Sequence, residues 1–508
     1  MTDPDQILEL SMLAAYLVVL LWIGIRSARR VKTSEDYTLA GRNVPWMIVL
    51  ATTGATMIGG GASVGMVSKV AEIGIAAALI TCAWHLQLIF TGLFVAPKLR
   101  GLNLITVGDY FELKFGPLAR ELAVVNCAIF LIGALAAQMA AIGMVTNSIL
   151  GVSYETALLI GAAVTIFYST VGGITAVVKT DVLQFVILVI GIGTAAIILF
   201  SYHDGFSGMA ENAQRGQFSI TSNWSPIRVF SLFFAYLLGE TFVPPYAVRC
   251  FIARDAQQAR WGVAGAGIFL LLFLPVATLI LGTAAQISPD VQQAMEKEKV
   301  RIQTDALEAG TEVSDKDAKK QSFQIAFPTL VRTTFHPIVA GLVIAAIIAA
   351  VMSSGDSCLS CLSTVVMEDV YRRHVNQTAS DHQLLRVAQW TTLLSGLAAA
   401  IFAWYVRNIA DLLEFIYDFW APTMVLPFLV GIFWYDKSRI IAVVVSMIVG
   451  IIAVIVWRFV LGSPGDIGPA LFGFVAAVIA YLIALPMTSQ IPPAGLFQPT
   501  DEESSPDG

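Results

Sequence analysis

The sequence predicts an all-α polytopic membrane protein, and its composition and its apolar runs carry that prediction. Of the 508 residues, 57% are hydrophobic and only 13% are charged, with a mean hydropathy of +0.75, which excludes an ordinary water-soluble domain. Apolar runs of about 20 residues, each long enough to cross the bilayer core as a helix, recur along nearly the whole chain. Because lipid-exposed backbone must form its hydrogen bonds internally, we expect these runs to be helices.

About thirteen spans follow from the apolar runs, and an odd number of crossings puts the termini on opposite sides of the membrane. Lysine and arginine gather after spans one, three, seven, nine and eleven, and by the positive-inside rule these loops are cytoplasmic. We therefore expect a multi-pass protein of the cell (inner or plasma) membrane, with its N-terminus outside, its loop 288–335 outside and its C-terminus cytoplasmic. The predicted spans are 7–27, 44–68, 73–96, 120–149, 154–172, 177–202, 226–247, 261–287, 336–370, 384–405, 409–434, 439–461 and 466–487.

Two of these spans are expected to break near their middle. Span two contains a triple glycine at 59–61, and each glycine costs about 1 kcal/mol against alanine in a helix. Close helix packing through small residues is the plainer alternative there. Span seven carries Gly239-Glu240 and then Pro244-Pro245, and the two prolines remove two amide donors from the helix. We therefore expect an interruption in both spans.

Spans two and seven are each the first of five consecutive spans, 44–202 and 226–434. Interrupted helices in corresponding positions of two such halves are typical of inverted-repeat transporters with a binding site near the bilayer midplane. The predicted parts are an extra N-terminal transmembrane helix, a first and a second inverted repeat, two C-terminal transmembrane helices and a disordered cytoplasmic tail, at residues 1–36, 37–205, 206–435, 436–487 and 488–508.

Span nine carries a ladder of polar residues inside an otherwise apolar helix. Its hydroxyls recur at three- and four-residue steps, which on a helix places them near one another and near the carboxylate of Asp356. Hydroxyl and carbonyl oxygens suit a hard cation such as sodium, and freed carbonyls around Ala55 and Ile58 in span two can supply opposing ligands. Serines that only let membrane helices pack closely are the alternative. The hydroxyl residues are Ser353, Ser357, Ser360 and Thr364.

Three acids lie inside apolar spans, Glu240 in span seven and Glu414 with Asp418 in span eleven. Unpaired carboxylates at membrane depth are costly, so these should be protonated, paired, hydrated or facing a cation. With Tyr417 beside them they favour an amine or zwitterionic solute, while sugars, monocarboxylates and other small nutrients remain open. The other candidates for contact with the solute are Gly59, Gly60, His85 and Gln87. For His85, packing in the protein interior without solute contact is at least as good an interpretation.

Several short motifs stand out in order along the chain. They are YTLAGRN at 37–43, GGITAVVKTDVLQ at 172–184, PPYAVR at 244–249, MSSGDS at 352–357 with EDVYR at 368–372, and PFLVGIFW at 427–434. Together they make the chain resemble the sodium:solute symporter family, the relatives of sodium–proline, sodium–glucose and sodium–sialic acid transporters. The resemblance covers roughly residues 37 to 434.

This resemblance implies a leucine-transporter-like core of two inverted five-helix repeats, with one extra helix before it and two after. It also implies Na+ as the coupling ion. The principal sodium site that the resemblance implies consists of backbone carbonyls and hydroxyls of Ala55, Ile58, Ala350, Ser353 and Ser354.

The resemblance further implies a role for Asp181, which matches an aspartate that serves sodium coupling or a second sodium site in some members. Asp356 stands where members with that second site have a serine, although Ser357 remains. Lys179 stands where an aromatic residue is frequent. The lysine can pair with Asp181 or Asp356, or extend to the cytoplasmic surface.

The predicted function is sodium-coupled secondary active symport that imports a small organic solute by alternating access. Proton coupling through Asp181 and Asp356 is an alternative, as is a channel or sensor on the same scaffold. A membrane enzyme using these acids or Glu240 is disfavoured, because no nucleophile–base or metal constellation accompanies them. The expected partners are the solute (an amine, amino acid, sugar or carboxylate) and the lipid bilayer. A net charge of −6 without a basic tract indicates no nucleic acid, and no obligate protein partner is evident.

Overall fold

The computed structural model describes residues 4–29, 31–220, 224–308, 312–405, 409–436 and 439–488. Apart from an isolated parallel bridge between Val44 and Ala253, the regular structure of these residues is helical. The tail predicted at 488–508 lies, beyond Thr488, outside the described residues. The prediction of an all-α chain is confirmed.

The membrane spans follow the predicted apolar runs. Within the described residues, 10 segments are long and apolar enough to cross a membrane, and two bent helix pairs bring the number to 12. The remaining predicted span, 154–172, forms the first part of α9 (Tyr154–Tyr202), which bends at Gly173 with φ 51° and ψ −156°. The expected count of about thirteen is therefore not confirmed.

Both predicted helix interruptions are present. The first span consists of α3 (Trp46–Met57), the π-helical turn η2 (Gly61–Gly65) and α4 (Met66–Ile73), and its halves meet at 60°. The second consists of α11 (Pro226–Gly239) and α12 (Pro244–Ile252), which meet at 41°. Pro244 and Pro245 occupy the first turn of α12, where a helix has no use for their missing amides. Each interruption thus falls at the glycines or prolines that predicted it.

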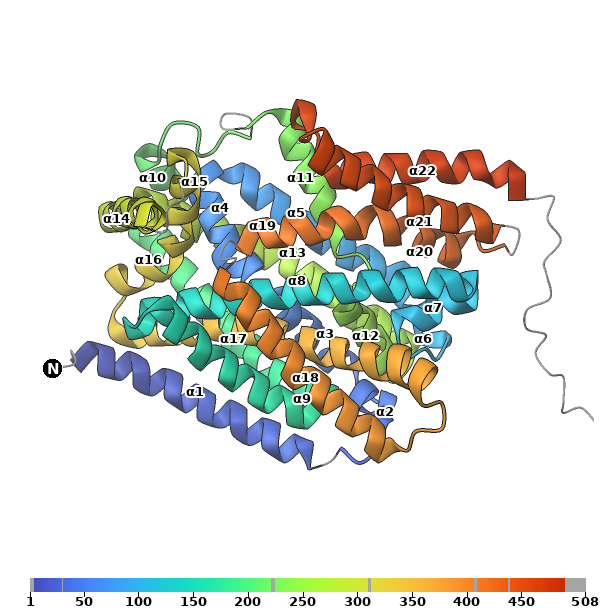
Figure 1. The fold of residues 1–508 in the computed structure, drawn as a ribbon. Coiled ribbons are helices and arrows are strands. Elements are labelled where there is room, and N and C mark those ends of the chain that lie inside the picture. The colour runs from blue at the N-terminus through green and yellow to red at the C-terminus, as the bar shows by residue number, and fades with distance from the viewer. Residues whose placement is uncertain are drawn as a thin grey trace, which may run out of the picture.

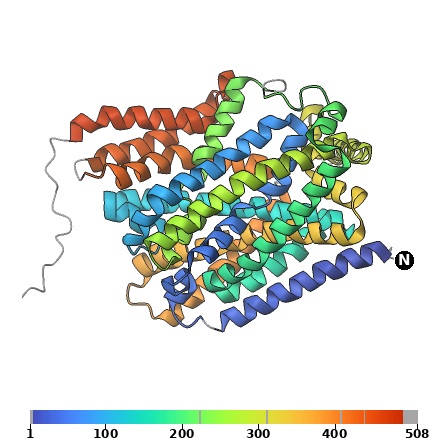
Figure 2. The same cartoon turned by 180° about the vertical axis from the view of Figure 1, so that it is seen from behind.

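The centre of the bundle is α17 (Pro337–Thr364), which continues as the π-helical segment η5 (Val365–Val375) and packs against α9, α8 (Pro117–Leu150) and α3. Two pairs of neighbours complete the core: α5 (Ile75–Phe90) lies along α13 (Ala256–Ile287), as Figure 2 shows, and α19 (Ile409–Trp420) lies against α8. The two interrupted spans reach this core through α3 and α12, which both pack against α17.

The predicted extra helices flank this core. α1 (Pro4–Ala28) packs on α9 and α17 along one side, and α21 (Ile440–Ile455) and α22 (Pro469–Thr488) pack together on the opposite side (Figure 1). Loop 288–335 forms α14 (Pro289–Glu308), α15 (Asp315–Ser322) and α16 (Ala326–Thr334) at the end of the bundle where α1 begins (Figure 1). The remaining helices are α2 (Ser34–Leu39), α6 (Ala96–Gly101), α7 (Val107–Phe115), α10 (Gly205–Asn212), α18 (Asp381–Tyr405) and α20 (Leu426–Phe433).

Candidate cation and solute sites

The interrupted end of α3 meets the middle of α17 at the predicted sodium site. Ser353 Oγ lies 2.8 Å from the backbone carbonyl oxygen of Ala55 and 3.0 Å from that of Ala350 in its own helix. Ser354 Oγ donates to the carbonyl of Thr56 over 2.7 Å. All of these residues are buried. Two adjacent hydroxyls of α17 therefore reach two consecutive carbonyls of α3.

Ile58 is the residue at which α3 ends. Its φ of −83° and ψ of 64° leave the helical region, while its amide still donates to the carbonyl of Gly54. The last carbonyls of a helix have no intrahelical partners, and here those of Ala55 and Thr56 are turned toward the hydroxyls of Ser353 and Ser354. A set of hydroxyl and carbonyl oxygens suits a hard ion. The predicted residues therefore fit sodium by their chemistry and their position.

The residues of the predicted second cation site surround Arg249 of α12, which is fully buried. Arg249 Nη2 lies 2.9 Å from Asp181 Oδ2, and the carboxylate also accepts from Thr52. The same nitrogen lies 2.7 Å from Thr56 Oγ1 and 2.6 Å from Ser357 Oγ. One guanidinium nitrogen thus contacts a carboxylate and two hydroxyls that come from three helices.

Asp356 lies in the same interior region and is fully buried. Its Oδ2 accepts a hydrogen bond of 2.7 Å from the hydroxyl of Tyr168 on α9. The structure therefore brings Asp181, Asp356 and Ser357 together, as the sequence analysis expected, and adds the cation Arg249 to them. Of the two carboxyl groups, that of Asp181 forms the ion pair with Arg249, and such pairing offsets much of the cost of burying both groups.

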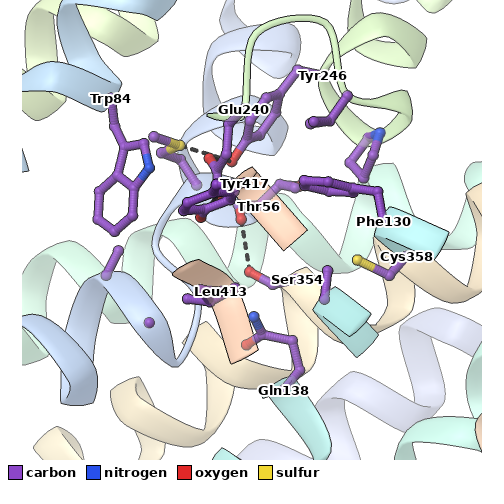
Figure 3. A pocket seen from close by; sticks show the side chains of 17 residues that line it. Thr56, Trp84, Phe130, Gln138, Glu240, Tyr246, Ser354, Cys358, Leu413 and Tyr417 are labelled. Atoms are coloured by element: carbon purple, nitrogen blue, oxygen red, sulfur yellow. Dashed lines mark hydrogen bonds between the residues drawn. The ribbon is translucent and has the colours of Figure 1, made fainter. Parts of the chain in front are cut away.

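A pocket with an empty volume of about 470 Å³, which includes space open to solvent, lies beside the cation site (Figure 3). Thr56 and Ser354 form part of its wall, and Gly59 of the interrupted span lines it as well. Gly60 donates its amide to Oε1 of Gln138 over 2.8 Å, and Gln138 also lines the pocket. Aromatic side chains from α5, α8, α12 and α19 form much of the remaining wall: Trp84, Phe130, Tyr246 and Tyr417.

Glu240 supplies the carboxylate of this pocket, at the point where α11 ends. Tyr417 donates its hydroxyl hydrogen to Oε1, and Tyr246 donates to Oε2 over 2.7 Å. A Cβ atom at Gly239 would lie 2.5 Å from Cγ of Tyr417, so the glycine lets this ring reach the carboxylate. Glu240 and Tyr417, both predicted from the sequence, therefore meet in one pocket.

Glu414 and Asp418 do not line the pocket and are ion-paired instead. Glu414 pairs with Lys69 of α4. Asp418 pairs with Arg458 and accepts the backbone amide of Ala470, at the start of α22, over 3.1 Å. These two acids therefore join α19 to α4 and to the C-terminal helices.

His85 and Gln87 are buried in α5 and do not line the pocket. Gln87 Nε2 donates to Thr91 Oγ1 over 2.9 Å. Neither ring nitrogen of His85 has a hydrogen-bond partner among the described residues. On this helix it is the neighbouring Trp84 that reaches the pocket.

Comparison with known proteins decides the family. The model of the sodium:solute symporter family matches residues 37–450, well over half of the chain. The chain belongs to the sodium:solute symporter family. Members of this family are secondary transporters, so the protein is a symporter and not an enzyme.

The symporter has relatives named for different small solutes. It is 27% identical to the sodium/glucose cotransporter of Vibrio parahaemolyticus, over 87% of this chain and 84% of the relative. It is 28% identical to the high-affinity proline transporter of Bacillus subtilis (strain 168), over 86% of this chain and 89% of the relative. The high-affinity choline transporter 1 of Caenorhabditis elegans is 24% identical over 90% of this chain and 78% of the relative.

A solved structure supports the fold. It is described as the substrate-bound outward-open state of a Na+-coupled sialic acid symporter and covers 94% of this chain and 97% of its own, with a TM-score of 0.78 and 22% sequence identity. This likeness confirms the expected leucine-transporter-like architecture of the symporter.

Sequence reasoning missed Arg249 and most of the pocket wall. The predicted span seven ended at 247, which left Arg249 among the cytoplasmic charges, whereas α12 runs to Ile252 and carries it into the interior. Trp84 and Phe130 lie in predicted spans without a distinguishing signal. Gln138, a polar residue in the apolar span 120–149, is the one that could have been found.

Proposed function

We propose that this symporter imports a small organic solute together with sodium by alternating access. The observation that carries the proposal is the contact of Ser353 Oγ with the carbonyl of Ala55 over 2.8 Å, where α3 is interrupted. Bound sodium supplies a positive charge between α3 and α17. The proposed ligands are the carbonyls of Ala55, Ile58 and Ala350 and the hydroxyls of Ser353 and Ser354.

Coupling follows from the position of the pocket beside this site. Ser354 contacts the Thr56 carbonyl, and both residues also line the pocket. An ion that ties α3 to α17 therefore also holds one wall of the pocket, so the ion and the solute stabilise the same arrangement of these helices. Inward movement of one charge down a 100 mV potential releases about 2.3 kcal/mol, which is available to drive solute accumulation.

We place the solute in the pocket lined by Gly59, Glu240 and Tyr417, with Gly60 directly beside it. The names of the relatives refer to glucose, proline and choline, which supports a small organic solute here. The lysines and arginines between spans support an outer N-terminus and a cytoplasmic C-terminus. The other residues predicted to contact the solute are left out because they do not line the pocket: His85, Gln87, Glu414 and Asp418.

Uptake into vesicles containing the purified symporter tests the proposal. Radiolabelled glucose, proline and choline are offered under an inward sodium gradient, with an equal potassium gradient as the control. We expect one of them to accumulate unchanged above its outside concentration, and we expect an ionophore that dissipates the sodium gradient to abolish accumulation. Saturable uptake separates a symporter from a channel.

Proton coupling is the second candidate, and the burial of Asp181 and Asp356 favours it. Buried carboxylates are the groups that carry protons in transporters. Uptake that responds to acid outside and ignores sodium would select proton coupling and contradict the sodium proposal.

A further inference from the structure

The pocket contains a carboxyl group that no cationic residue of the described lining pairs with. Among the described residues that line it there is no lysine, arginine or histidine, and Glu240 is the one carboxylate. Two buried cations lie on neighbouring helices, and both form ion pairs with other acids. Arg249 pairs with Asp181, and Lys69 pairs with Glu414. An anionic solute would therefore meet repulsion in this pocket, whereas a cation would meet an available partner.

The carboxylate of Glu240 is oriented and keeps acceptor positions for a ligand. The hydroxyls of Tyr417 and Tyr246 donate to its two oxygens, one to each. An ionised carboxylate offers about four acceptor positions, so the two phenols leave about half of them to a bound solute. The phenols hold Glu240 at the end of α11 and facing the pocket (Figure 3).

Aromatic rings enclose this carboxylate. In the view of Figure 3, Trp84 and Phe130 lie on opposite sides of Glu240 and Tyr417. The rings of Phe130 and Tyr417 are stacked, with centroids 6.3 Å apart. The face of an aromatic ring attracts a cation, and ammonium ligands are commonly held by a group of such rings.

The symporter already holds one of its own ammonium groups in this way. Lys69 Nζ pairs with the carboxylate of Glu414, lies 5.5 Å from the centroid of the Tyr236 ring and is 3.4 Å from its hydroxyl oxygen. Tyr236 in turn packs edge-on against Tyr417, at 5.4 Å between centroids. The same combination, a carboxylate beside tyrosine rings, recurs in the pocket with no lysine attached.

We propose that the solute carries an organic ammonium group, which lies against Glu240 and between the rings of Trp84, Phe130 and Tyr417. This inference rests on the proposed function for the location of the solute site. Part of the polar wall is already engaged, since Ser354 donates to the Thr56 carbonyl and Oε1 of Gln138 accepts from Gly60. A sugar, which needs many free polar partners, is therefore a poorer match than an amine.

Binding of three probes to the purified symporter tests the charge of the solute. Choline carries a quaternary ammonium, dimethylbutanol is its neutral carbon isostere, and betaine is a zwitterion of similar size. Thermal unfolding is followed with each probe in sodium and in potassium. We expect choline to raise the unfolding temperature and dimethylbutanol to leave it unchanged. Preference for the neutral isostere, or for glucose, would overturn the inference, whereas stabilisation by betaine, which also carries a quaternary ammonium, would support it.

Variants of Glu240 locate the effect in the pocket. Glu240→Gln keeps the size of the side chain and should weaken choline binding at least about tenfold, because the charged partner is lost. Glu240→Asp, which keeps the charge, should retain more of the binding. Tyr246→Phe keeps its aromatic ring, so it should weaken choline binding less than Trp84→Leu, which removes an aromatic ring from the pocket. Equal choline binding by Glu240→Gln and the unchanged protein would overturn the inference.

The failure of this inference can be told apart from the failure of the proposed function. Stabilisation by sodium alone, measured on the same Glu240→Gln preparation, shows that the variant is folded and that the cation site is intact. Choline binding that is equal in sodium and potassium would contradict sodium coupling and leave the ammonium site standing.

A separate observation concerns the number of coupling ions. Arg249 Nη2 lies within 2.9 Å of Asp181 Oδ2 and 2.6 Å of Ser357 Oγ, which are the oxygens that a second sodium would need. While the guanidinium is in place, these two oxygens are engaged, and Oδ1 of Asp181 is the oxygen of this carboxylate without a hydrogen-bond partner among the described residues. We infer that Arg249 is a tethered cation in that position, so that one sodium accompanies each solute. This inference rests on the proposed sodium coupling.

Equilibrium binding of radioactive sodium to the purified symporter, without solute, counts the ions. We expect one ion for the unchanged protein, two for Arg249→Gln, and one again for Arg249→Gln combined with Asp181→Asn. Two ions bound to the unchanged protein would overturn the tethered cation and leave sodium coupling standing. No bound ion would overturn the proposed function, and this inference with it. The count for the unchanged protein decides the matter even if the variants do not fold.

Discussion

At the residue scale, several interior charges of this symporter are arranged in pairs, whereas the carboxyl groups of Glu240 and Asp356 accept hydrogen bonds from tyrosine hydroxyls instead. Asp181 and Arg249 are both fully buried and lie 2.9 Å apart, and Glu414 faces Lys69. Removing one partner of such a pair costs about 3–5 kcal/mol, since a lone charge is left behind. Glu240 has phenols as its hydrogen-bond donors, and for that reason its charge is available to a ligand. In the proposed cation site, the group available to the ligand is neutral: it is the hydroxyl of Ser353.

Ser353→Ala removes the hydroxyl that contacts the carbonyl of Ala55. We expect the sodium concentration for half-maximal stabilisation to rise at least about tenfold, which corresponds to about 1.4 kcal/mol, in line with the loss of one hydroxyl ligand. The measurement is a sodium titration of thermal unfolding. Ser363→Ala is the matched control, because the hydroxyl of Ser363 donates to the carbonyl of Ser360 in its own helix. Identical sodium dependence of the two variants would remove Ser353 from the site.

At the element scale, the interrupted helix depends on close approach as well as on a flexible backbone. A Cβ atom at Gly60 would lie 2.5 Å from Cβ of Ala141, a group that cannot move without its backbone. At Gly65, one turn further, the nearest atom would be the carbonyl oxygen of Gly60 at 3.5 Å, an ordinary contact. The interrupted segment can therefore approach α8 this closely at Gly60 because glycine has no side chain.

Gly60→Ala is expected to destabilise the symporter by about 1–3 kcal/mol, the usual cost of forcing an extra methyl group into a packed interior. Gly65→Ala is the matched control on the same span and should be close to neutral. Thermal unfolding in detergent, at equal sodium, compares the two. An unchanged unfolding temperature for Gly60→Ala would show that α8 yields at this contact.

At the scale of the whole molecule, a charged network ties one end of the bundle. Arg120 of α8 pairs with Asp109 and Glu112 of α7 and with Asp369 of η5, and Arg373 also pairs with Glu112. Partial burial raises the pKa of Glu112, but hydrogen bonds from Arg373 and Arg120 outweigh it and hold that pKa below its ordinary value of 4.5. The ion pairs of Glu112 with Arg120 and Arg373 therefore stabilise the structure above about pH 4.5, and their contribution disappears as pH falls below that value. The helices α14 and α16 cover the opposite end (Figure 1).

Sodium is expected to stabilise the whole molecule, because it joins α3 of one predicted repeat to α17 of the other. At a sodium concentration 100 times the dissociation constant, the gain is about 2.7 kcal/mol for one site. The unfolding temperature should rise with sodium and stay constant when potassium replaces it at equal ionic strength. Equal effects of the two ions would indicate general salt stabilisation and contradict a specific site.

The helical architecture, the interrupted spans and the family were accessible from the sequence, because each depends on local chemistry. Hydrocarbon requires helices, glycines and prolines mark where a helix ends, and helical spacing places the hydroxyls of span nine near one another, namely Ser353, Ser357, Ser360 and Thr364. The structure places Ser353 Oγ 2.8 Å from the carbonyl oxygen of Ala55, two residues that the resemblance to the family had put in one predicted site.

Only the tertiary structure decided which polar side chains meet. Helical periodicity shows which residues share a face, but not what the opposing helix presents to them. In the sequence, Glu240, Glu414 and Asp418 are all acids inside apolar spans. In the structure, Glu414 forms an ion pair with Lys69 and Asp418 forms one with Arg458. Of the three, Glu240 alone lines the pocket. The same holds for the rings around Glu240, which four helices distant in sequence bring together. Pairing across helices is set by the packing of the whole bundle, and that packing left one carboxylate of the three available to a solute.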